Sequence, residues 1–224
     1  RGKIMKIKII EKSYDEVMKI EPKKFKGVKK PNIFFRTLLK IITLPDFWFG
    51  KFKLEKIGLE KWKKKESALI LMNHSAFTDG KIISTIFYPR PMNIIVTTDG
   101  FVDKNWIMRE IGCFPTPKFV SDPGLIRNSA KALKKGSNVV MFPEAGYSFD
   151  GTKTIFPKTV AKFVKFLKVP VISVITDGVF LQQPLYNELR KRKVKLSTKA
   201  KYLLSPEDIK NMNEQLMEIF LSRR

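Results

Sequence analysis

From residue 67 onward, short apolar runs alternate with longer stretches whose apolar residues recur at helical spacing. The runs predict strands over 68–73, 92–98, 138–143, 171–176 and, near the C-terminus, 193–203. The intervening stretches predict helices over 80–87, 101–111, 125–135 and 159–167, and a Ser205-Pro206 capping sequence predicts a terminal helix to about Leu221. Strands separated by helices are typical of parallel crossover units. We therefore expect an α/β fold, with a mixed, mostly parallel sheet flanked by helices.

The first 66 residues follow a different pattern. Residues 33–44 predict a helix that is apolar around most of its circumference, with Arg36 and Lys40 as a thin polar stripe, and we expect Pro45 to end it. Such a helix either lies in a membrane surface or packs on the domain core, and the sequence leaves both open. We therefore divide the chain into a basic N-terminal segment with an amphipathic membrane-associating helix (1–66) and an α/β domain (67–224). The candidate membrane-associating residues are Phe34, Phe35, Leu38, Leu39, Ile42 and Trp48.

Charge adds a class of partner to this picture. The chain has 44 basic and 21 acidic residues, a net charge of +23, and residues 1–66 hold 20 of the basic and 8 of the acidic ones. Such a charge favours polyanions: an anionic membrane, an acidic carrier protein or nucleic acid. Because most of the cations are Lys and no DNA-binding motif appears, we expect no specific nucleic acid.

The sequence also bears on location. No apolar run approaches the roughly 18 residues that cross a bilayer, and the first twelve residues do not resemble a signal peptide. We therefore expect a peripheral or monotopic protein on the cytoplasmic face of the cell membrane. Cys113, the single cysteine, excludes an intramolecular disulfide, and we interpret it as a small buried hydrophobe.

A histidine and an aspartate follow the first strand predicted after residue 66. Reactive groups of α/β sheets gather beyond the carboxyl ends of strands, where His74 falls, and Asp79 follows where the loop turns into a helix. A carboxylate bound to one imidazole nitrogen fixes the tautomer and raises the basicity of the other nitrogen. The pattern alone leaves open that Thr78 or Asp79 only caps the helix. His74 is the only histidine, so the chain has no other candidate imidazole base.

Four ordered sequence blocks carry a family resemblance. Asn73-His74, four residues and Asp79 resemble the NHxxxxD signature of the glycerolipid acyltransferases, a family that includes lysophosphatidic acid acyltransferase. Residues 142–148 (FPEAGYS) resemble the family's FPEGTRS block, and residues 169–172 (VPVI) resemble its last block. Residues 112–115 with Lys118 stand where another block ends in a substrate-binding Arg.

The resemblance implies direct acyl transfer without a metal or cofactor. His74 would be the general base and Asp79 its orienting partner, with an acyl thioester of CoA or acyl carrier protein, or an acyl phosphate, as donor. The expected reaction acylates the free hydroxyl of 1-acylglycerol 3-phosphate, a lysophospholipid, giving phosphatidic acid in phospholipid biosynthesis. The expected substrate-binding residues are Asn73, Ser75, Lys118, Glu144, Ala145, Gly146, Ser148 and Pro170.

The departures from the family pattern concern the acceptor. Ala145, Gly146 and Tyr147 replace the usual Gly, Thr and Arg, and Lys118 replaces an Arg. A Lys is a point charge rather than a planar fork, so phosphate must be bound differently. Glycerol 3-phosphate, another lysophospholipid or a glycolipid therefore stays open as acceptor. The alternatives of another class are a basic nucleic-acid-binding protein and a membrane-docking pseudoenzyme.

Overall fold

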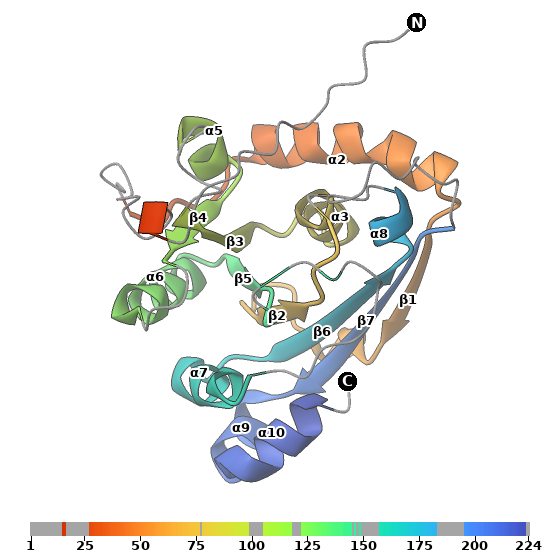
Figure 1. Cartoon of the computed structure of the whole chain (residues 1–224). Coiled ribbons are helices and arrows are strands. Elements are labelled where there is room, and N and C mark those ends of the chain that lie inside the picture. The colour runs from red at the N-terminus through yellow and green to blue at the C-terminus, as the bar shows by residue number, and fades with distance from the viewer. Residues whose placement is uncertain are drawn as a thin grey trace, which may run out of the picture.

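A seven-stranded sheet organises the chain (Figure 1). The computed structural model describes residues 15–16, 27–76, 78–98, 105–117, 122–144, 146, 148, 157–182 and 195–222. The strand order is β1-β7-β6-β2-β5-β3-β4, and every neighbouring pair is parallel except β6–β7. The predicted mixed, mostly parallel α/β fold is confirmed. The strands are β1 Lys53–Ile57, β2 Leu69–Met72, β3 Met92–Thr97, β4 Cys113–Thr116, β5 Asn138–Met141, β6 Val171–Asp177 and β7 Ser197–Leu204.

Helices cover both faces of this sheet (Figure 1). Helices α6, α7, α9 and α10 contribute to the apolar cluster on one face, and α3 packs on the other. Within the described residues, no helix combines the length and apolar character needed to cross a membrane. The helices are α2 Ile33–Phe49, α3 Asp79–Ile86, α5 Asn105–Glu110, α6 Pro123–Lys134, α7 Thr159–Leu167, α8 Val179–Gln182, α9 Pro206–Asn211 and α10 Glu214–Ser222, with a 3-10 turn, η1, at Leu59–Lys61.

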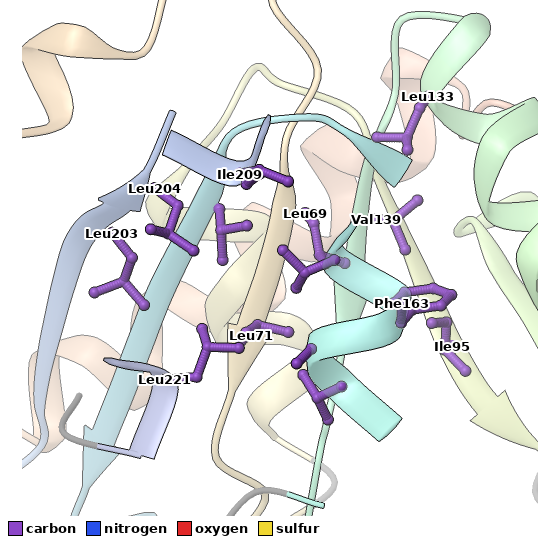
Figure 2. Close-up of a cluster of buried hydrophobic side chains, with 14 of the residues drawn as sticks. Leu69, Leu71, Ile95, Leu133, Val139, Phe163, Leu203, Leu204, Ile209 and Leu221 are labelled. Atoms are coloured by element: carbon purple, nitrogen blue, oxygen red, sulfur yellow. The ribbon is translucent and has the colours of Figure 1, made fainter. Parts of the chain in front are cut away.

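The central strand β2 shows why the core forms here. All four of its residues are fully buried, because a parallel strand covered on both faces must be apolar on both sides. Leu69 and Leu71 point into the cluster beneath α7 (Figure 2), whereas Ile70 and Met72 point into the cluster with α3.

Two strands were not predicted from the sequence. β1 alternates Lys and Glu with apolar residues and reads as a polar segment, because it lies at an edge and is only half buried. β4 contains Pro115, which a sheet accepts at an edge strand. Because β1 precedes residue 67, the sheet uses residues on both sides of the predicted domain boundary.

Two helix boundaries were also predicted wrongly. Helix α2 does not end at Pro45 but continues to Phe49. Ile41, whose carbonyl loses its helical donor at Pro45, is exposed, so water can replace the lost bond. The predicted terminal helix is two helices, α9 and α10, although Ser205 caps the first of them as predicted.

Candidate active site

The loop that carries His74 follows the middle strand of the sheet. β2 lies between β6 and β5, and residues 73–78 connect it to α3, which begins at Asp79. His74 therefore lies beyond the carboxyl end of a central parallel strand. Ligands of open α/β sheets bind in this region.

The structure brings His74 and Asp79 into contact. Nδ1 of His74 lies 3.0 Å from Oδ2 of Asp79, and the Asp79 side chain is fully buried while the imidazole is partly exposed. A carboxylate only accepts hydrogen bonds, so Nδ1 carries the proton in this pair, and in the neutral imidazole Nε2 carries the lone pair. This is the tautomer that a general base requires.

The Asp79 carboxylate is itself held by the loop. Its Oδ2 also accepts hydrogen bonds from the backbone N–H groups of Ser75 (2.7 Å) and Ala76 (2.9 Å). Three donors thus converge on one oxygen, and the loop closes around the carboxylate. The buried Oδ1 accepts no hydrogen bond from the described residues. The position of Asp79 is therefore fixed by the same loop that carries His74.

The segment after β5 packs against His74 from another side. The Phe142 ring stacks on the imidazole, with ring centroids 4.0 Å apart and planes 20° from parallel. The backbone N–H of Ser148 donates to the His74 carbonyl at 2.7 Å, and the His74 N–H lies 3.5 Å from Oε2 of Glu144. Two of the blocks found in the sequence therefore meet at one residue.

Asn73 joins the ends of two strands. Its Nδ2 donates to the Thr176 carbonyl at 2.9 Å, and its Oδ1 accepts from the Thr176 N–H at 2.8 Å. Both groups of the side-chain amide therefore bind the backbone of β6. This pairing positions the residue before His74, whereas the predicted contact of Asn73 with substrate stays a prediction.

The other predicted substrate-binding residues have different locations. Ser75 is buried, and Glu144 and Ser148 flank the His74 backbone. Gly146 is exposed, and Lys118 and Ala145 lie outside the described residues.

Pro170 is not brought to the site. Its carbonyl accepts from the N–H of Leu69, at the start of β2, whereas His74 lies beyond the end of that strand. β2 and β6 run parallel, so Pro170 lies at the amino ends of these strands, opposite to the carboxyl ends where His74 lies. The 169–172 block begins at the amino end of β6, and the sequence similarity alone did not indicate at which end of the strands it would lie.

Other chemistry in the described residues is limited. No group of three or more His, Cys, Asp and Glu side chains within them could hold a metal ion. Burial raises the pKa of Cys113 to about 12, so its thiol stays protonated at neutral pH and is no ready nucleophile. This agrees with the interpretation of Cys113 as a packing residue.

Helix α2 packs on the domain through its polar stripe. The Arg36 guanidinium donates to the Pro89 carbonyl, Thr37 Oγ1 lies 3.1 Å from the Tyr88 hydroxyl, and Lys40 Nζ lies 4.4 Å above the Tyr88 ring. Asp46 also pairs with Lys81 of α3 at 2.7 Å. Helix α2 therefore lies on the domain, held by this polar stripe and, near its C-terminal end, by Phe47, which packs against an apolar cluster. Its predicted association with a membrane surface stays a prediction.

The apolar face of α2 points outward as a result. Phe34 is 65% and Trp48 82% exposed, and Thr43 is the only residue of the helix that is fully buried. Leu38 and Ile42 are also exposed, whereas Phe35 and Leu39 are half buried.

The outward apolar surface continues onto α5. The helix itself lies within the predicted range 101–111, but its exposed apolar surface was not predicted from the sequence. Trp106 is 69% exposed, and its ring contacts Phe35 edge-on at 6.0 Å. Ile107 beside it is also exposed.

Comparisons with known proteins identify a family for the chain and a similar fold. The model of the Acyltransferase family matches residues 53–204, about two thirds of the chain, from the start of β1 to the end of β7. Among solved structures, the chain is similar to the 1-acyl-sn-glycerophosphate (LPA) acyltransferase PlsC from Thermotoga maritima. The two are 18% identical, with a TM-score of 0.61, over 84% of this chain and 77% of that one. This likeness concerns the fold. No curated protein matched.

Proposed function

Because the chain belongs to the acyltransferase family, we propose that it transfers a fatty acyl chain from an acyl thioester to the free hydroxyl of 1-acylglycerol 3-phosphate. The observation that carries the proposal is the contact between His74 Nδ1 and the buried Asp79 carboxylate. The similarity in fold to a protein described as an LPA acyltransferase supports this acceptor. The product would be phosphatidic acid, an intermediate of phospholipid biosynthesis.

The proposed mechanism is a direct transfer. Nε2 of His74 removes the proton from the acceptor hydroxyl while the hydroxyl oxygen attacks the thioester carbonyl. The C–O bond forms, the C–S bond breaks, and the imidazolium returns the proton to the leaving thiolate. Asp79 stabilises the imidazolium while it exists. General-base assistance of this kind contributes roughly 10²- to 10⁴-fold in rate, and substrate positioning supplies the remainder.

The acceptor is the finer part of the proposal. Glu144, Gly146 and Ser148 belong to the segment that packs on His74, so an acceptor bound there would hold its hydroxyl close to the base. Lys118 is the proposed cation for the acceptor phosphate. The same chemistry on glycerol 3-phosphate, another lysophospholipid or a glycolipid is the alternative. CoA and acyl carrier protein are both proposed as carriers of the donor, which is a co-substrate rather than a bound cofactor.

We further propose that the protein works on the cytoplasmic face of an anionic membrane. The exposed apolar residues of α2, together with Trp106 and Ile107, support this location because their burial in lipid would be favourable. The net charge of +23 adds attraction to anionic headgroups.

A panel assay tests the reaction. Wild type and His74→Ala are compared with Lys165→Ala, an exposed residue of α7, on four acceptors: 1-acylglycerol 3-phosphate, glycerol 3-phosphate, a neutral lysophospholipid and a glycolipid. Each acceptor is tried with acyl-CoA and acyl carrier protein donors. We expect His74→Ala to lose at least about 10²-fold in kcat and Lys165→Ala to match wild type. Equal turnover by wild type and His74→Ala would refute the catalytic assignment, and turnover confined to another acceptor would refute the proposed substrate.

A further inference from the structure

We propose that Phe142 is a positioning residue for catalysis, because its ring fixes the plane in which the His74 imidazole presents Nε2. The inference rests on the proposed function of His74 as the general base. It starts from the stacked contact between the two rings, with centroids 4.0 Å apart and planes 20° from parallel.

Strand register places the two rings together. β2 and β5 are parallel neighbours, with Leu71 opposite Met141. Phe142 directly follows Met141, and His74 lies three residues beyond Leu71, so both lie at the carboxyl ends of these strands. The backbone bond from the Ser148 N–H to the His74 carbonyl holds the two segments together at a second point. The sheet therefore brings the two residues close enough for their rings to stack.

The stack supplies a constraint that Asp79 cannot supply alone. The hydrogen bond at Nδ1 acts at one edge of the imidazole, so it resists a tilt of the ring plane only weakly. A flat ring packed on the face of the imidazole opposes this tilt. Catalysis depends on such placement, because an error of about 1 Å in a reacting group costs on the order of 10² in rate.

The chemistry of Phe142 suits this role. A phenyl ring has no donor or acceptor that competes for Nε2. Its negative face also favours the imidazolium that forms when His74 accepts a proton. A Leu at this position keeps apolar volume but loses the flat face, whereas a Tyr keeps the face. The substitutions thus separate ring stacking from simple apolar packing.

Kinetics provide the first half of the test. We expect Phe142→Leu to lower kcat about 10- to 100-fold with little change in the acceptor KM. Phe142→Tyr should keep most of the wild-type kcat. The matched control is Phe87→Leu, the same change in the same apolar cluster, where the side chain contacts Trp62 instead of His74. We expect this control to lose similar stability but to keep kcat within about threefold of wild type.

The second half is an NMR measurement on His74, which gives a single set of imidazole signals because the chain has one histidine. The Phe142 ring should shield the imidazole protons in wild type and Phe142→Tyr, and this upfield shift should be lost in Phe142→Leu but kept in Phe87→Leu. Unchanged imidazole signals in Phe142→Leu, or a kcat equal to that of Phe87→Leu, would overturn the positioning role and leave acyl transfer intact. A wild type without turnover on any acceptor would overturn the proposed function itself.

Discussion

At the scale of single residues, the Asp79 carboxylate has both a structural and an electrostatic role. Its Oδ2 accepts from the His74 ring and from two backbone N–H groups of the loop, while its charge lies beside the imidazole. The geometry allows the two roles to be separated. In Asp79→Asn, an amide oxygen in the place of Oδ2 would keep all three hydrogen bonds and the His74 tautomer.

We predict that Asp79→Asn folds but loses about 10²-fold in kcat, because no negative charge remains to stabilise the imidazolium. The new amide NH₂ occupies the place of the buried Oδ1, so the free energy of unfolding should fall by about 1–3 kcal/mol. Steady-state kinetics and urea unfolding measure the two effects. Asp79→Ala is the comparison, since it also removes the acceptor of the loop N–H groups and should be less stable than Asp79→Asn. Near-wild-type kcat in Asp79→Asn would mean that the charge is not needed.

At the scale of elements, α2 is amphipathic with its polar side turned inward. Its stripe of Arg36, Thr37 and Lys40 binds the 88–89 segment, and its apolar face is open to solvent. An exposed apolar face on this scale marks an interaction surface. The arrangement allows the surface to be changed without disturbing the contacts that hold the helix on the domain.

We predict that Phe34→Gln weakens binding of the full chain to lipid vesicles by about tenfold or more, because one large side chain no longer leaves water. The free energy of unfolding should change by less than about 0.5 kcal/mol, since Phe34 is exposed in the folded protein. Vesicle sedimentation measures the first quantity and urea unfolding the second. Phe166→Gln is the matched control, because Phe166 has a similar exposure, 60%, and lies on α7, on the side of the molecule away from α2 (Figure 1). Equal loss of binding in both variants would refute α2 as the membrane surface.

The same elements show which features a sequence can predict. β2 and the position of His74 beyond its end were predicted because a doubly covered strand is a local apolar run. The family was predicted from ordered blocks and is confirmed by the family match over residues 53–204. The placement of Pro170, the stack of Phe142 on His74 and the inward turn of Arg36 were not predicted. Each of these depends on which segments distant in sequence meet, and no periodicity within one segment carries that information.

At the scale of the whole molecule, the basic residues behind the net charge of +23 do not all face solvent, and two of those on α2 contact the domain instead. From the sequence, Arg36 and Lys40 were only a thin polar stripe on an otherwise apolar helix. In the structure both bind the 88–89 segment, and burial lowers the pKa of Arg36, partly offset by the charge of Tyr88. We therefore expect the proposed attraction to anionic lipid to come from other basic residues. Lys51 is such a candidate, because it is exposed and follows the exposed Trp48 and Phe49 at the end of α2.

We predict that Lys51→Gln weakens binding to vesicles containing anionic lipid about fivefold at low salt, because a cation near such a surface contributes about 1 kcal/mol. Lys40→Gln removes the same charge, so the two variants have equal net charge, and any difference between them reports position alone. Lys40→Gln should bind these vesicles nearly as wild type does and should instead lower the free energy of unfolding by about 0.5–1 kcal/mol, since it loses the contact with the Tyr88 ring. Raising the salt concentration should reduce the deficit of Lys51→Gln, because exposed charges are screened. The same loss of binding in both variants would mean that total charge, rather than its placement beside α2, controls attraction to the membrane.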